Sequence, residues 1–203
     1  MVGTVKIPDF LKPGHEILPV KPLSIIPVHI VIETKRLWLR SFTPDDAPLI
    51  LALNSDPEVT RFTGDPVRDL DHAQQVLEQH ILPQYALYNH GRWAVHIKTL
   101  TGPAPGGFIG WCGLKARPER NEVDLGYRFM RPAWGKGYAT EAAYACLQYG
   151  FQQLGLPRIV GRSMPQNLAS VRVLEKCGMT FVKEEIVDDH PALTYEARNP
   201  LIP

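Results

Sequence analysis

Residues 131–140 read Arg-Pro-Ala-Trp-Gly-Lys-Gly-Tyr-Ala-Thr, and this stretch decides the fold. It follows a strand-like run over 123–130 and leads into an alanine-rich segment with helical periodicity over 141–154. Two glycines one residue apart, Gly135 and Gly137, allow a turn in which backbone N–H groups converge, and a helix that begins there adds the positive end of its dipole. The stretch therefore predicts a phosphate-binding turn at a helix N-terminus.

Two other kinds of phosphate-binding turn fit this spacing poorly. A Walker loop needs Gly-x-x-x-x-Gly-Lys followed by Ser or Thr, whereas Lys136 lies between the glycines and is followed by Gly137. A Rossmann fingerprint has a third small residue where Thr140 stands, and it needs an acid at the end of the next strand, which the run over 158–163 lacks. We set both aside; NAD binding in a thermal-shift screen tests the dinucleotide alternative.

The turn resembles motif A of the GNAT superfamily of N-acetyltransferases, written Gln/Arg-x-x-Gly-x-Gly/Ala, with Trp134, Gly137 and Ala139 at its defined positions. A second run, Asn167 to Met179, resembles motif B, in which Asn-x-x-Ser/Ala begins a helix that closes on Lys-x-Gly-Phe. The resemblance covers roughly residues 33–187. Two motifs in this order identify a member of the superfamily, and the wording Trp-Gly-x-Gly-Tyr-Ala-Thr-Glu-Ala is most similar to the branch of ribosomal-protein N-terminal alanine acetyltransferases.

The resemblance implies an α/β (α+β) fold with a mixed, mostly antiparallel sheet flanked by helices. Two strands of that sheet, expected over 123–130 and 158–163, splay apart at the acyl-CoA site. Residues 33–203 are predicted to form this acetyltransferase domain. Residues 1–32 carry prolines at positions 8, 13, 19, 22 and 27, so neither a helix nor a central strand can run through them, and we predict an extended N-terminal arm.

Hydrophobic periodicity and turn residues predict the other elements of the domain. The expected helices cover 44–54, 69–89, 138–154 and 168–177, and the expected strands cover 34–42, 93–98, 108–115, 122–130, 158–163, 181–187 and 193–198. No chemistry is assigned to the loop over 99–107. By the resemblance, residues 57–62 lie beside the acceptor site.

Composition narrows the possible partners. The formal net charge of +1 over 203 residues, with acids and bases interleaved, gives no broad basic surface for nucleic acid or an anionic membrane.

Three widely spaced cysteines in apolar patterns indicate buried free thiols in a reducing compartment. The histidines form no His-x-x-x-His pair, so no metal site is expected. The longest apolar run, 23–32, is too short for a spanning helix. We expect a cytoplasmic protein, either a monomer or a homodimer.

Acetyl-CoA is the acyl donor that the resemblance implies. Backbone amides of 135–140 should hold its pyrophosphate, and the backbone of 129–131 should pair with the pantetheine amides. The residues expected to bind the cofactor are Phe129, Met130, Arg131, Gly135, Lys136, Gly137, Tyr138, Ala139, Thr140, Asn167, Ser170, Arg172 and Lys176. Plain solvent exposure is the better explanation of any one of the four basic side chains, but not of all four together. A simple N-cap role for Asn167 is compatible with the same position.

Four residues are candidates for the chemistry. The N–H of Met130 is expected to polarise the thioester carbonyl. Asp124 and Glu122, two residues apart on a strand, are candidate bases for the acceptor amine. A solvated strand acid is an equally good interpretation of Asp124 and a better one of Glu122. Many relatives protonate the departing thiolate with a tyrosine, but Leu174 stands at that position here. Ser170, one turn earlier, is the best substitute, and a thiolate of pKa about 8.5 can also leave unaided.

The sequence therefore predicts an N-acetyltransferase that moves an acetyl group from acetyl-CoA to a primary amine by direct attack in a ternary complex. The acceptor is expected to be a protein N-terminal α-amine or a small-molecule amine, and an aminoglycoside-like amine and a polyamine remain open. The alternative is a catalytically silent CoA-binding sensor or scaffold. Turnover of acetyl-CoA with any amine separates the two.

Overall fold

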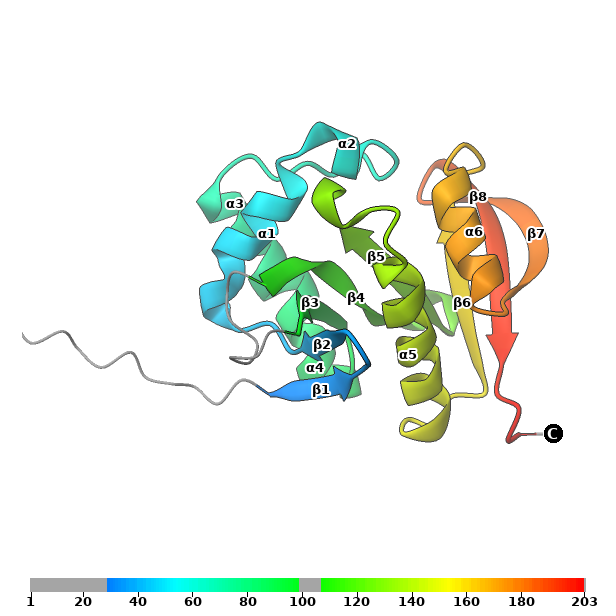
Figure 1. Ribbon diagram of the computed structural model, residues 1–203. Coiled ribbons are helices and arrows are strands. Elements are labelled where there is room, and N and C mark those ends of the chain that lie inside the picture. The colour runs from blue at the N-terminus through cyan, green and yellow to red at the C-terminus, as the bar shows by residue number, and fades with distance from the viewer. Residues whose placement is uncertain (1–28, 99–106, 203) are drawn as a thin grey trace, which may run out of the picture.

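The computed structural model describes residues 29–98 and 107–202. The predicted arm up to residue 28 and the loop over 99–106 lie outside the described residues. The described residues form one eight-stranded sheet with helices packed on both of its faces (Figure 1).

The sheet has the order β1-β2-β3-β4-β5-β6-β8-β7. Its strands are β1 (Ile30–Glu33), β2 (Leu37–Arg40), β3 (Arg92–Ile97), β4 (Phe108–Arg117), β5 (Glu122–Phe129), β6 (Arg158–Ser163), β7 (Thr180–Val187) and β8 (His190–Arg198). Every neighbouring pair is antiparallel except β5 and β6, which run parallel. The prediction of a mixed, mostly antiparallel sheet is confirmed.

The parallel seam between β5 and β6 is very short. Only Asp124 with Val160 and Leu125 with Gly161 pair across it, although β5 continues to Phe129. On its other side β5 pairs with β4 along its whole length. The strands therefore separate beyond residue 125, which is the splay that the sequence predicted.

The helices are α1 (Ala47–Asn54), α2 (Pro57–Thr60), α3 (Leu70–Val76), α4 (Leu82–Tyr88), α5 (Tyr138–Gln152) and α6 (Leu168–Lys176). The helix expected over 69–89 is divided by a π-helical turn, Leu77–Ile81, just before Pro83, because proline cannot supply the next backbone N–H. Within the described ranges, no helix combines the length and the apolar character needed to cross a membrane.

Alternation along the strands divides the core into two layers. Trp93 and Val95 on β3 face one layer, under α5, while Ala94 between them faces the other, under α1 and α3. The layer under α5 includes Cys112 and Cys146, and together with Cys177 these are buried free thiols, as predicted. Figure 1 shows α5 and α6 side by side over the splayed strands.

Several elements differ from the sequence-based expectation; the strand expected over 34–42, for example, is limited to Leu37–Arg40. The sheet begins at β1, so residues 30–32, which the proline pattern places in the arm, belong to the domain. Strand β8 begins at His190 and not at 193, because Asp188 and Asp189 both adopt positive φ and close a tight hairpin with β7. The short helix α2 is absent from the sequence-based expectation; the Asp56 carboxylate caps it by accepting from the Glu58 N–H.

Candidate active site

The glycine turn links β5 to α5. After a 3-10 turn over 131–133, Gly135 and Gly137 take φ values of +73° and +78°, in the left-handed region that other residues rarely adopt. Gly137 is the N-cap of α5, and no side chain caps the helix. Open space surrounds Gly135, since no atom lies within 4 Å of the place where a Cβ would stand.

Backbone donors converge at this turn. Within the described ranges, the N–H groups of Gly135, Lys136 and Gly137 reach no hydrogen-bond acceptor. The first N–H groups of α5, from Tyr138 onward, have no partner inside the helix either, and the 15-residue helix adds its dipole. An exposed cluster of unpaired donors at a helix N-terminus suits a diphosphate. Residues 135–140 therefore fit the cofactor group that the sequence predicted for them.

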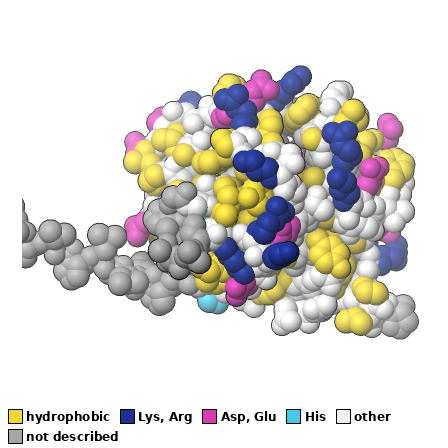
Figure 2. Space-filling model, viewed as in Figure 1, with side chains coloured by type: hydrophobic (Ala, Val, Ile, Leu, Met, Phe, Trp, Pro, Cys, Tyr) yellow, Lys and Arg dark blue, Asp and Glu magenta, His cyan; other side chains and the backbone are white. Residues whose placement is uncertain are grey.

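The four basic side chains predicted to bind the cofactor differ in where they lie. Lys136, Arg172 and Lys176 are exposed. Figure 2 shows Lys and Arg side chains gathered on the face that carries α6 and the start of α5. Arg131 instead points to α2, where its Nε donates to the Asp56 carboxylate at 2.6 Å. As the molecule stands, Arg131 holds α2 and does not turn toward the glycine turn.

The last residues of β5 direct their backbone groups to opposite sides. The Met130 N–H donates to the Ile109 carbonyl at 2.9 Å, which continues the ladder with β4. Since neighbouring residues alternate, the N–H and C=O of Phe129 point away from β4, toward the gap beside β6. The amide that faces the gap is thus that of Phe129, and the Met130 amide is engaged inside the sheet.

Trp134 closes one side of this gap. Its indole N–H donates to the Phe129 carbonyl at 2.6 Å, and about half of the residue, 48%, remains exposed. The side chain that replaces the Gln or Arg of motif A therefore bonds to the protein backbone.

Replacing Trp134 with phenylalanine is expected to keep CoA affinity within a few-fold of wild type, because the indole N–H serves Phe129. It should lower the free energy of unfolding by about 1 kcal/mol, the usual net value of one hydrogen bond. Calorimetric titration with CoA and thermal unfolding measure both effects. A large loss of affinity at unchanged stability would instead assign the indole N–H to the cofactor.

A tyrosine that sequence reasoning missed spans the gap. The Tyr127 hydroxyl on β5 donates to the Ser170 carbonyl on α6 at 2.9 Å and lies 3.0 Å from the Ser170 Oγ. Burial raises the pKa of Tyr127 well above its ordinary value, so the phenol stays protonated. Alternation could have found it, because Tyr127 shares the face of β5 that carries Leu125 and Phe129.

Asn167 and Leu174, two other motif B positions, have different roles. The Asn167 Oδ1 accepts from the Ser170 N–H at 3.1 Å, which is the N-cap role that the sequence allowed. Leu174 is 1% exposed and packs in the core under α5, so nothing polar stands at the position of the tyrosine found in many relatives. On this face, polar groups of Ser170 and Tyr127 meet between α6 and β5.

Both candidate bases are held by arginines. The Asp124 carboxylate accepts from the Arg92 guanidinium at 2.7 Å, and these side chains are 14% and 15% exposed. Glu122 contacts Arg162 at 2.7 Å and Arg120 at 3.1 Å, and its side chain is 7% exposed. These contacts are those of a structural ion-pair network on the face of the sheet opposite α5 and α6.

The network continues into a groove of about 320 Å³ over β6, β7 and β8. Glu185 in this groove accepts from the Thr194 hydroxyl at 2.7 Å and lies 3.4 Å from Arg162. Burial alone would raise the pKa of Glu185, but the bond from Thr194 and the positive charges beside it lower the pKa to about 2. Glu196 pairs with Arg198 at 2.8 Å. The acids of the groove thus already have partners among its own side chains.

A fourth arginine anchors the segment beyond α1. The Arg128 guanidinium donates to Thr63 at 2.7 Å and to both oxygens of Asp65 at 2.8 and 3.0 Å, and it also bonds to the Asn54 side chain. It lies 5.6 Å from the centre of the Trp111 ring. Only 9% of this side chain is exposed. Arg128 thus holds Asn54, Thr63 and Asp65 beside the end of β5, on both sides of residues 57–62, which by the resemblance lie beside the acceptor site.

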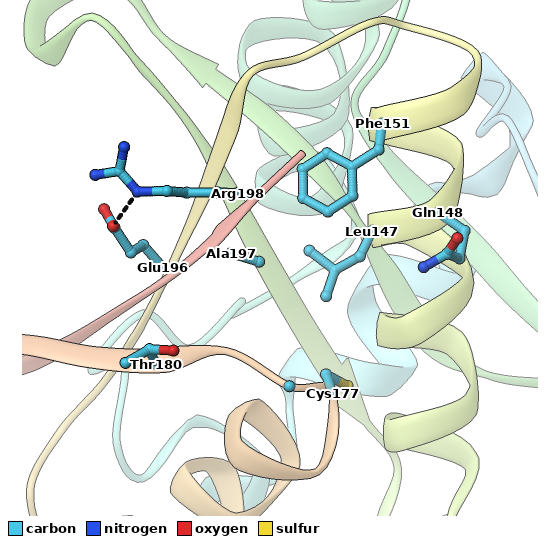
Figure 3. A pocket seen from close by; sticks show the side chains of 9 residues that line it. Leu147, Gln148, Phe151, Cys177, Thr180, Glu196, Ala197 and Arg198 are labelled. Atoms are coloured by element: carbon cyan, nitrogen blue, oxygen red, sulfur yellow. Dashed lines mark hydrogen bonds and ion pairs between the residues drawn. The ribbon is translucent and has the colours of Figure 1, made fainter. Parts of the chain in front are cut away.

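One cavity lies away from the glycine turn. It measures about 390 Å³ and opens between the C-terminal half of α5 and strand β8. Leu147 and Phe151 line it from the helix, with Ala197 and Arg198 opposite (Figure 3). None of the predicted site residues lines this cavity. No group of three or more possible metal ligands occurs within the described ranges.

Comparison with known proteins gives these features a family. The profile of the Acetyltransferase (GNAT) domain matches residues 36–180. The chain is 31% identical over 160 residues to the uncharacterized N-acetyltransferase p20 of Bacillus licheniformis, a match that covers 77% of this chain and 85% of the relative. It is 30% identical over 162 residues to the FsC-acetyl coenzyme A-N(2)-transacetylase of Aspergillus fumigatus, covering 75% and 66%.

Among solved structures, spermidine N-acetyltransferase from Vibrio cholerae, determined with CoA and spermine, superposes with a TM-score of 0.66. It is 18% identical, and the match covers 82% of this chain and 97% of that one, so it supports the fold. None of these comparisons distinguishes the ribosomal-protein branch. The domain match spans both motifs and the splayed strands. The chain therefore belongs to the GNAT family of acetyltransferases.

Proposed function

We propose that this acetyltransferase acts on an amine of low pKa, foremost an α-amine of a protein N-terminus or of a small molecule, by direct attack in a ternary complex. Enzymes of the family take the acetyl group from acetyl-CoA. One observation carries the choice of amine: Asp124 and Glu122 are both bound by arginines at 2.7 Å. Each carboxylate already bonds to an arginine, which makes it a poor partner for a strongly basic amine.

The charge pattern also argues against a polyamine acceptor. A polyamine binds through several ammonium groups, which need carboxylates that are not already neutralised. On the face opposite α5 and α6, Glu122, Asp124 and Glu185 are each paired with at least one arginine. One relative's name specifies N(2), and one structural neighbour is named a spermidine N-acetyltransferase, so family membership leaves the choice of acceptor to the local charges.

The chain's own groups have distinct parts in the proposed reaction. The backbone donors of 135–140 hold the diphosphate of acetyl-CoA. The Phe129 N–H, which faces the gap between β5 and β6, stabilises negative charge on the thioester oxygen in place of the Met130 N–H. The Tyr127 phenol donates a hydrogen bond to the departing sulfur and takes over the part predicted for Ser170. The roles of Asp124 and Glu122 as bases remain predictions.

A matched pair of peptides tests the acceptor class. One peptide has a free N-terminus and a blocked lysine, and the other has the reverse. We expect the free N-terminus to be acetylated faster at pH 7, because an α-amine of pKa about 7.7 to 8.0 is already partly neutral while a lysine near 10.4 is not. The difference of more than two pKa units corresponds to roughly 3 kcal/mol of barrier.

Thiol release from acetyl-CoA, followed from about pH 6 to about pH 9, measures both rates across the α-amine pKa. Faster turnover of the lysine peptide at pH 7 would show that a general base exists, and Asp124→Asn and Glu122→Gln would then identify it. Absence of turnover with any amine, together with tight CoA binding, would favour the catalytically silent sensor.

A further inference from the structure

Arg36 lies beside the glycine turn although it is about one hundred residues away in sequence. It stands in the turn between β1 and β2, and its Nη1 donates to the Lys136 carbonyl at 2.9 Å. Its Nε donates to the Glu141 carboxylate on α5 at 2.6 Å, and its backbone N–H donates to the same carboxylate at 2.9 Å. One side chain thus bonds to both the turn and the first turns of the helix.

The position of the guanidinium group is well fixed. It lies over the Tyr138 ring at 4.5 Å from the centroid, and its Nη2 lies 3.5 Å from the place where a Cβ on Gly137 would stand. Burial raises the pKa of Glu141, but the hydrogen bonds from Thr34 and Arg36 outweigh this and leave the pKa below its ordinary value. The carboxylate is therefore charged, and the Arg36–Glu141 pair carries no net charge.

The bond to Lys136 determines the direction of the next amide. The Lys136 C=O and the Gly137 N–H belong to one planar trans peptide unit, in which they point in opposite directions. Since Arg36 holds the carbonyl on its own side, the Gly137 N–H must point to the other side. Glycine at φ +78° has no side chain to resist rotation of this peptide, so the orientation depends on an external contact.

We propose that Arg36 is a positioning residue for the diphosphate of acetyl-CoA. By holding the Lys136 carbonyl, it keeps the Gly137 N–H directed at the phosphate oxygens before the donor binds. This rests on acetyl-CoA as the acyl donor. Its contribution is orientation and not charge, because Glu141 neutralises the guanidinium group. Ordering the turn in advance removes part of the entropy that binding would otherwise cost.

The substitution Arg36→Lys separates orientation from charge, since lysine keeps the positive charge and loses the planar fork that reaches two acceptors. We expect the calorimetric Kd for CoA to rise about tenfold, as for loss of one charge-assisted hydrogen bond. In protein carrying nitrogen-15 glycine, CoA should shift the Gly137 amide proton strongly downfield in the wild type and much less in the variant.

Thr34→Val provides the matched control. The Thr34 hydroxyl donates to Glu141 at 2.7 Å, so this change weakens the same attachment to α5 but leaves the bond from Arg36 to Lys136. It should lower the melting temperature while leaving the Kd for CoA unchanged. If Arg36→Lys raises the Kd no more than Thr34→Val does, or if the Gly137 shift is equal in wild type and variant, the proposal is wrong. A wild-type protein that binds no CoA would overturn the donor assignment itself.

Discussion

Gly137→Val is expected to weaken CoA binding by at least about 100-fold, which corresponds to about 2.8 kcal/mol. Gly137 takes φ +78°, so a β-branched residue would force the backbone out of the left-handed region and turn the free N–H groups of 135–137 away from one another. The new side chain would also stand beside the diphosphate. Calorimetric titration with CoA measures the loss.

Gly155→Val is the control for backbone strain. Gly155 follows the other end of α5 and takes φ +63°, with no atom within 4 Å of the place where a Cβ would stand, so the local penalty is similar and the glycine turn is untouched. Both variants should lose stability, by roughly 1–3 kcal/mol. Only Gly137→Val should lose CoA. Equal affinity in the two folded variants would mean that the turn does not bind the diphosphate.

Tyr127→Phe is expected to lower kcat by about 10²-fold, the lower range for loss of a positioned proton donor. The phenol is the group that reaches from β5 to α6 across the gap, and removing it leaves the departing sulfur without that hydrogen bond. The Kd for CoA should stay close to the wild-type value, because the diphosphate contacts are elsewhere. Steady-state rates with a matched acceptor peptide, alongside calorimetry, separate the two effects.

Ser170→Ala is the comparison for Tyr127→Phe. Ser170 offers its carbonyl to the phenol as well as its Oγ, and the carbonyl survives the substitution, so we expect a much smaller fall in kcat. A larger effect from Ser170→Ala would return the donor role to the serine.

The raised pKa of Tyr127 determines how the rate should depend on pH. The Tyr127 hydroxyl loses its proton only at a pH above this raised pKa. Deprotonation of Tyr127 should therefore cause no fall in activity up to about pH 9.

Sequence reasoning recovered the features that depend on neighbouring residues. The glycine turn, the N-cap Asn167 and the end of α6 at Gly178 are local backbone chemistry, and each could be read from a few consecutive positions. The mixed, mostly antiparallel sheet and the splay followed from the family resemblance. The π-helical turn before Pro83 and the hairpin at 188–189 altered boundaries and not the topology.

Contacts between distant residues were beyond the reach of sequence patterns. Nothing near Asp124 in the chain indicates that Arg92, on another strand, binds its carboxylate, so a strand acid could pass for a base. Tyr127 lies on a strand, whereas the family pattern places the proton donor on the helix of Leu174. Strand β1 follows five prolines, which suggest an arm, but its place in the sheet depends on pairing with β2.

The two-pair seam between β5 and β6 has a consequence for the energetics of turnover. Across this seam the described main chains of β5 and β6 bond only briefly, and the two parts of the sheet are held together by the shared core under α5 and by side-chain contacts such as Tyr127 with Ser170. Acetyl-CoA bound in the gap would replace the main-chain hydrogen bonds that the two strands do not make with each other. Its binding would therefore raise the free energy of unfolding. Amide exchange along the inner edges of β5 and β6 would then report the occupancy of the enzyme, and each release of product would briefly return the molecule to its less cohesive form.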